Sequence, residues 1–239
     1  SGQTSGGTGT ASKITLNDLT LYCDYIFLDT DERRRFAQVS HEYLIEQVQF
    51  NGMNSHSAQG NGDSTKSVDL RFNHPCKEIV WVCPGTNPSV SSHGAETYAD
   101  TEEFNNYTGT KGDGTDLLAN RHLIKEVKLE LNGHDRFTPR DGSYFRTVQS
   151  YQHHTGAFAN VQSGSKHLGG IYSYSFALKP EDHQPSGTCN FSRIDNSVLA
   201  LTMAQGNDGA AGVNVKMYVY AVNYNVLRIM SGMGGLAYS

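Results

Sequence analysis

The chain has 239 residues, of which 37% are hydrophobic and 18% charged, a composition typical of a globular protein that can bury a sizeable core. Its formal net charge of -5 argues against a basic surface that grips a phosphate backbone, so we expect no direct nucleic-acid binding. No apolar run approaches the roughly 18 residues of a membrane helix, and the N-terminal residues lack the layout of a signal peptide.

The first twelve residues contain no large apolar side chain and consist mainly of Gly, Ser and Thr. Such a segment cannot bury enough surface to offset the entropy of ordering, so we interpret residues 1–12 as a flexible linker or an artificial end of the chain. Residues 13–239 are expected to form a single domain.

An apolar run covers residues 14–28, with its alternation broken near Asn17 and Asp18. This pattern predicts a strand with a bulge or a bend. Thr30 then precedes an acidic and a basic turn, which predicts a short helix over residues 31–36 with Thr30 as its cap.

Alternating apolar residues predict strands over residues 42–50 and 68–72, separated by a Gly/Asn/Ser loop over residues 51–67. A short apolar run at 78–83, stopped by proline and glycine, predicts a buried strand. Residues 84–120 show no sustained period. A connection of that length usually has a function, and we expect an outward-facing or intersubunit loop.

The second half of the chain predicts four more strands, over residues 122–131, 170–178, 193–203 and 213–229. One short helix is expected within residues 140–154 because apolar residues there recur at helical intervals. About eight strands with long connections predict an all-β fold: an eight-stranded, two-sheet jelly roll with short helices in its connections.

The ten histidines do not form a metal-binding pattern. His153 and His154 are adjacent and would point to opposite faces of a strand, and His41-Glu42 lacks the second histidine of an HExxH helix. The segment 60–67 ends like a phosphate loop but has Thr65 where glycine is required, so we interpret it as a polar, hairpin-like loop. We therefore predict no catalytic, metal or cofactor site.

The four cysteines include no CxxC pair and are too few for a disulfide-built scaffold, which favours folding in a reducing, intracellular place. None lies in a nucleophile signature, and several interrupt apolar strands, so we expect buried small hydrophobic residues. They are Cys23, Cys76, Cys83 and Cys189.

Two surface features remain as candidates. The run Arg33, Arg34 and Arg35 lies beside acidic residues and favours an intersubunit ion network over a nucleic-acid patch. Asn106 and Asn190 begin glycosylation sequons, a pattern short enough to occur by chance, and Asn106 in the long loop is the better candidate.

Three sequence blocks resemble the major capsid proteins of nucleocytoplasmic large DNA viruses, in particular the iridovirus-like branch. The first is ERRRFAQVSHEYLIEQ at residues 32–47, and the second is GTCNFSRID at residues 187–195. The third is the C-terminal region, with YAVNYN at 220–225 and GGLAYS at 234–239.

The resemblance implies a structural capsid protein and no enzyme. Its family has two consecutive jelly rolls and trimerises into a pseudo-hexameric capsomer of an icosahedral shell over an internal membrane; this chain corresponds to the second roll. The implied partners are other copies in a homotrimer, neighbouring capsomers, minor capsid proteins and, indirectly, the inner membrane. The implied location is the virion, after folding and assembly in the host cell cytoplasm.

Within that role, we expect intersubunit contacts from the arginine run and from the C-terminal segment. The candidate residues are Arg33, Arg34, Arg35, Met230, Leu236 and Tyr238.

Two other functions stay open on the sequence alone. A carbohydrate-binding jelly roll would use exposed rings such as Tyr98, Phe104 and Tyr107 against sugar faces. A metal-dependent, cupin-like enzyme would hold a divalent metal between facing strands.

Overall fold

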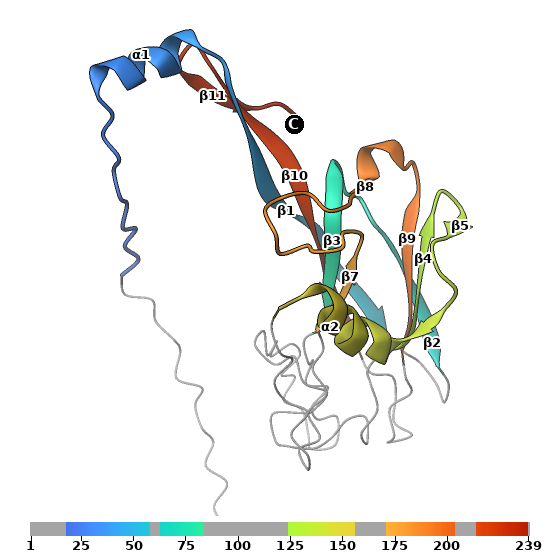
Figure 1. Cartoon of the computed structure of the whole chain (residues 1–239). Helices are drawn as coiled ribbons and strands as arrows, with labels where there is room; N and C mark the ends of the chain where they lie inside the picture. The colour runs from blue at the N-terminus through green and yellow to red at the C-terminus, as the bar shows by residue number, and fades with distance from the viewer. Residues whose placement is uncertain (1–17, 58–62, 84–123, 156–170, 204–213, 239) are drawn as a thin grey trace, which may run out of the picture.

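The computed structural model describes residues 18–57, 63–83, 124–155, 171–203 and 214–238. These residues form two antiparallel sheets that face one another, with one helix at the far end of a long two-stranded extension (Figure 1). The elements are α1 (Thr30–Gln38), β1 (His41–Ser57), β2 (Ser64–Asp69), β3 (Pro75–Val82), β4 (Ile124–Leu131), β5 (His134–Asp135), β6 (Arg140–Asp141), a π-helical turn (Tyr144–Val148), α2 (Gln149–His153), β7 (Ile171–Ser175), β8 (Cys189–Asn190), a 3-10 turn (Phe191–Arg193), β9 (Ser197–Met203), β10 (Asn214–Met230) and β11 (Met233–Leu236).

The strand order identifies the fold. The first sheet runs β1-β10-β3-β7, with β11 added to β10 and β8 added to β3; the second runs β2-β9-β4-β5, with β6 added to β4. Strands β1 to β4 alternate between the two sheets along the chain, so each of these connections crosses the sandwich. The two four-stranded paths make the eight positions of a jelly roll, which confirms the predicted fold class.

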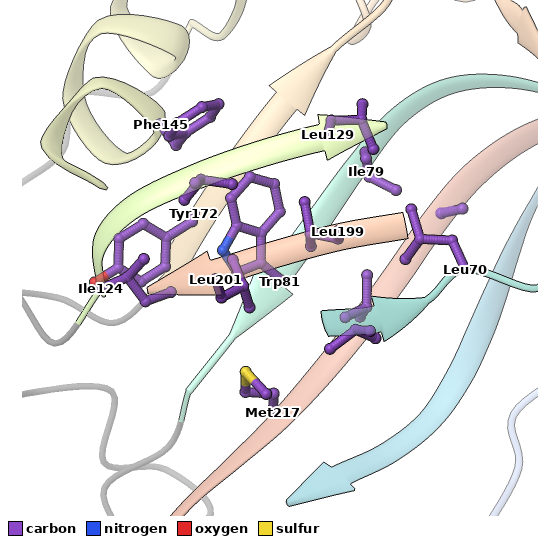
Figure 2. Packing of buried hydrophobic residues seen from close by; sticks show 14 of the residues in the cluster. Leu70, Ile79, Trp81, Ile124, Leu129, Phe145, Tyr172, Leu199, Leu201 and Met217 are labelled. Carbon is purple, nitrogen blue, oxygen red and sulfur yellow. The ribbon is translucent and has the colours of Figure 1, made fainter. Parts of the chain in front are cut away.

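The core lies between the sheets and follows the two-residue period of the strands. In β9 the side chains of Leu199, Leu201 and Met203 are buried, while the alternate residues are only partly buried. Trp81 of β3 stacks on Tyr172 of β7, with ring centroids 6.0 Å apart (Figure 2). Each such fully buried large side chain stabilises the fold by roughly 1.5–3 kcal/mol.

The segment 69–73 runs beside the edge of β1 and bonds to it through side-chain amides. Gln49 donates to the carbonyl of Asn73 and accepts from the same residue's N–H, at 2.8 and 2.9 Å. Asn51 likewise donates to the carbonyl of Asp69 and accepts from the N–H of Arg71, both at 2.8 Å. The two amides therefore hold the connection that follows β2 against the first sheet.

The predicted helix after residue 30 is confirmed, but its cap is different. The Asp29 carboxylate accepts from the N–H of Glu32 at 2.9 Å, and Thr30 is the first helical residue. A carboxylate accepts hydrogen bonds from the free N–H groups, and its negative charge also interacts favourably with the positive end of the helix dipole. A hydroxyl accepts the hydrogen bond but carries no charge. The helix expected within 140–154 is also present, beginning at Tyr144 after the short strand β6.

The predicted strand at 14–28 is wrong for the residues that the structure describes. Residues 18–28 form no strand, and their large side chains are exposed. Apolar alternation gives a segment strand propensity, but a strand also needs a partner for its backbone groups, and these residues pair with no strand among the described residues.

The predicted loop at 51–67 is also wrong, because β1 continues to Ser57 and β2 begins at Ser64. A bulge between Phe50 and Met53 accommodates the break in the pattern. The connection is not hairpin-like, since β1 pairs with β10 and β2 pairs with β9 in the other sheet.

In β4 the alternation shifts by one residue near its start. Ile124 is buried and Lys125 is exposed, and a register irregularity separates Ile124 from Glu126 in the pairing with β9. Lys125 is therefore exposed although it lies two residues before the buried Val127. The expected features at 1–12 and 84–120 lie outside the described residues, together with Asn106 and the aromatic residues of the carbohydrate-binding alternative.

Candidate assembly surface

The long strands β1 and β10 extend beyond the sandwich as a ribbon. We call residues 41–47, 224–230 and 233–236 the terminal ribbon; in it β10 lies between β1 and the short strand β11. Figure 1 shows α1 and β11 together at the far end of this ribbon, away from the second sheet.

Polar contacts fix the C-terminal residues to the terminal ribbon. Asn225 is buried and donates both to the side-chain oxygen of Gln47, at 2.9 Å, and to the carbonyl of Tyr238, at 2.8 Å. Arg228 pairs with Glu42 at 2.7 Å, but both side chains are about half exposed, so this ion pair contributes less than about 1 kcal/mol. The buried amide of Asn225 therefore holds the C-terminal residues, whereas the ion pair joins β10 to β1.

Helix α1 has no buried residue. Arg34 pairs with Asp31 at 3.6 Å, and both side chains are well exposed. Arg33 and Arg35 are exposed as well, and because consecutive helical residues point about 100° apart, the three guanidinium groups spread around the helix. The helix offers positive charge in several directions rather than on one face.

The other candidate contact residues lie along the terminal ribbon. Met230 ends β10, Leu236 ends β11, and Tyr238 follows; their side chains are 52%, 49% and 60% exposed. The structure thus brings Met230 to the end of the ribbon that carries the arginine run, although they are nearly 200 positions apart in the sequence. Leu236 lies opposite Leu227, partway along the ribbon, and Tyr238 lies at its base beside Asn225 and His74.

Residues 18–28, here called the arm, run from α1 away from both sheets (Figure 1). Except for Leu28, which is 39% exposed, their large apolar side chains are almost fully exposed, with Leu19 at 89%, Tyr22 at 91% and Phe27 at 92%. A folded monomer rarely exposes so many adjacent large apolar residues, and such patches mark interaction surfaces.

A second apolar surface covers the outer face of the first sheet, and the sequence prediction missed it. Phe50 of β1 is half exposed and stacks on Tyr220 and Tyr218 of β10, with centroids 5.1 and 6.0 Å apart. Val48 and Met53 on β1 are also more than half exposed. The available signal was the two tyrosines alternating with buried Met217 and Val219, since a strand that is apolar on both faces is covered on both faces.

A buried ion pair joins the base of the terminal ribbon to the sandwich. The ammonium of Lys77 on β3 lies 2.7 Å from the carboxylate of Glu46 on β1, and the Lys77 side chain is only 4% exposed. The same ammonium lies 5.5 Å from the ring centroid of Tyr224, within cation-π range. These contacts set the direction in which the ribbon leaves the sandwich.

His153 and His154, which were considered as metal ligands, contact different groups. His153 contacts the carbonyl of Leu178, whereas His154 bonds to the Glu78 carboxylate at 2.8 Å, which raises the pKa of His154. No group of three or more His, Cys, Asp or Glu side chains suited to a metal occurs among the described residues. Neither helix in that part of the chain is long and apolar enough to cross a membrane.

Asn190 is half-buried at the end of β8, and its side-chain oxygen accepts from the N–H of Ser192 at 3.1 Å. The hydroxyl of Ser192, the third residue of this sequon, accepts from the N–H of His74 at 2.8 Å. Both polar residues of the sequon thus take part in local structure.

The cysteines are free thiols, as expected, but they differ in burial. Cys76 and Cys83 are buried, and burial raises the pKa of Cys83 to about 12. Cys189 is partly buried. Cys23 lies in the arm and is exposed, so the prediction of a buried residue is wrong there because the arm itself is uncovered.

Comparison with known proteins identifies the family. Residues 32–235 match the family model described as large eukaryotic DNA virus major capsid protein. The chain belongs to this family. The major capsid protein of Pyramimonas orientalis virus is 48% identical to it, covering 96% of this chain and 51% of the relative. That of Paramecium bursaria Chlorella virus 1 is 42% identical, covering 92% of this chain and 54% of the relative.

The structural comparison agrees. A chain from the quasi-atomic model of the PBCV-1 virus capsid aligns with 90% of this chain and 55% of its own length, with a TM-score of 0.63 and 40% sequence identity. These matches confirm the expected family, and the relatives that they name are capsid proteins. The chain spans about half the length of these relatives.

Proposed function

We propose that this chain is the second jelly roll of a longer major capsid protein, and that it assembles into a trimeric, pseudo-hexameric capsomer of an icosahedral shell. The arm carries the proposal. Its side chains at Leu19, Tyr22 and Phe27 are about nine-tenths exposed, and no part of the described chain covers them. The relatives are about twice as long, and the remaining half supplies enough protein to cover the arm.

The arm has the pattern of a strand that is missing its sheet. In an extended conformation, Leu19, Leu21, Cys23, Tyr25 and Phe27 share one face, and every one of them is apolar. Pairing with an edge in the other half of the protein would satisfy the backbone groups of the arm and bury this face.

Contacts between copies use the other surfaces. The arginines of α1 and the exposed Met230 lie at the far end of the terminal ribbon, and Leu236 and Tyr238 are exposed nearer its base, where a neighbouring subunit can reach them. The apolar outer face of the first sheet suits a second β-sandwich, because sheets stack through apolar faces. The partners in this proposal are two further copies in the trimer, neighbouring capsomers, minor capsid proteins and, indirectly, the inner membrane, with folding and assembly in the host cytoplasm.

Light scattering after size-exclusion chromatography tests the proposal. The chain is co-expressed with the upstream half of its full-length protein, and we expect the two halves to co-purify as a trimer of the pair. The arm variant Tyr25→Ser/Phe27→Ser, which changes two residues of this face, should lose the complex. Leu178→Ser, a variant of another exposed apolar residue far from the arm in sequence, should keep it.

The chain alone gives a second measurement. A mass of about 79 kDa, three times the 26.2 kDa of one chain, would show that this jelly roll carries enough of the trimer contact by itself. If the co-expressed halves stay separate and monomeric over a range of concentrations, the proposal fails.

A further inference from the structure

Strand β8 is only two residues long, and it places two thiols directly opposite one another. In its antiparallel pairing with β3, Cys189 is the register partner of Cys76, and Asn190 is the partner of Pro75. Both cysteines are free in this structure. The sequence gives no hint of the pairing because more than 100 residues separate the two positions.

The backbone geometry suits a disulfide. Directly opposite residues of an antiparallel pair have Cα atoms about 4.5–5.5 Å apart, within the range of about 4.4–6.8 Å that a disulfide spans. Cys76 belongs to the buried core cluster, and Cys189 packs against that cluster. Burial raises the pKa of the Cys76 thiol, and the charge of a Cys189 thiolate adds to that rise.

The two thiols differ in access. Cys76 is fully buried, and its sulfhydryl donates to the carbonyl of Glu78 at 3.0 Å. Cys189 is only partly buried; burial raises the pKa of its thiol, and the positive charge of Arg136 opposes that rise. Cys189 is therefore the thiol that a reagent in solution reaches first.

We propose that Cys76 and Cys189 form an intramolecular disulfide when the protein passes from a reducing to an oxidising environment. The oxidant is a low-molecular-weight disulfide, RSSR. The Cys189 thiolate attacks one sulfur of RSSR and expels one RS⁻, and the Cys76 thiolate then attacks the Cys189 sulfur and expels the other. The two cysteines lose two electrons and two protons, and RSSR becomes two molecules of RSH.

The bond would fasten the connection between β7 and β9 to the first sheet. It closes a loop of roughly 110 residues, and long loops gain the most from cross-linking because the unfolded chain loses the most freedom. Virion surfaces meet oxidising conditions that the cell interior does not provide. A capsid protein could thus fold and assemble with free thiols and become more resistant to unfolding afterwards.

Mass spectrometry of the whole chain tests the proposal. The Cys23→Ser variant serves as the parent, because exposed Cys23 would otherwise link separate chains. This parent is incubated with oxidised or reduced glutathione, denatured, alkylated and digested. We expect a peptide that joins Cys76 to Cys189, an intact mass lower by about 2 Da before alkylation, and a melting temperature higher by roughly 10 °C.

Two further variants in the same background complete the design. Cys189→Ser should lose both the linked peptide and the rise in melting temperature, whereas Cys83→Ala should keep both. A stable glutathione adduct on Cys189, two unmodified thiols, or a link through Cys83 would each overturn the proposal. The result does not depend on capsomer assembly, since both cysteines lie within one chain.

Discussion

Removing the charge of Glu46 should destabilise the sandwich more than removing the charge of an exposed glutamate on the same strand. Its carboxylate lies 2.7 Å from the ammonium of Lys77, whose side chain is 4% exposed, while that of Glu46 is 35% exposed. Glu46→Gln keeps the shape of the side chain but leaves the buried ammonium without its counter-charge, apart from the face of the Tyr224 ring.

The magnitude follows from the burial of each partner. Breaking a fully buried pair costs about 3–5 kcal/mol, and breaking an exposed pair costs less than about 1 kcal/mol. With one partner buried and the other one-third exposed, we expect Glu46→Gln to lower the free energy of unfolding by about 2 kcal/mol. Lys77→Met removes the buried charge itself and leaves Glu46 in reach of water, so it should cost about 1 kcal/mol or less.

Urea unfolding of the two single variants and the double variant gives the coupling energy, which we expect to be about 1–2 kcal/mol with an unchanged denaturant slope. Glu42→Gln is the matched control, because the pair of Glu42 with Arg228 is about half exposed at both ends. The reasoning is refuted if Glu46→Gln changes stability no more than this control, or if the two single changes simply add.

Three further predictions concern other parts of the chain. The hydrogen bond to Glu78 raises the pKa of His154 above its ordinary value of 6.5, so this pair stabilises the fold fully below pH 6.5 and loses its effect as the pH rises through the raised pKa. His154→Gln should therefore flatten the melting temperature between about pH 5.5 and 8.5, and an unchanged profile would contradict this. Leu201→Ala in the core should cost about 2–5 kcal/mol in urea unfolding, and a loss below 1 kcal/mol would mean that the site collapses around the smaller residue. Asn225→Ala removes the bond to the Tyr238 carbonyl and should speed hydrogen exchange in the C-terminal peptide, whereas equal exchange would show that the amide is not its anchor.

The architecture could be predicted because most strands place every second side chain in the core, and this burial leaves an alternating apolar pattern in the sequence. Strands β3, β9 and β10 lie within a few residues of their predicted positions. The predicted number of eight was nevertheless reached partly by error. The arm was counted as a strand, while β5, which completes the second sheet, is too short to have a period.

The surfaces were harder to predict than the core. Arg33 to Arg35 and the C-terminal residues were chosen through a family resemblance, and the structure places Met230 beside the arginine helix but Tyr238 at the base of the terminal ribbon. Their role in assembly stays a prediction. The pairing of Cys76 with Cys189 depends on the register between distant strands, which a single sequence does not contain.

The amides of Gln49 and Asn51 have a consequence for a protein made in many copies at high concentration. Strand β1 lies at the edge of its sheet, and an open edge is a template on which another chain can add without limit. Each of these side chains carries one donor and one acceptor, as a peptide group does, and pairs with the backbone of residues 69–73 as a neighbouring strand would. This stretch of the edge is thereby closed from within the same molecule. Copies of the protein then associate through other surfaces, each of which takes a fixed number of neighbours. Contacts of that kind build a closed shell, whereas unlimited addition at a strand edge builds a fibre.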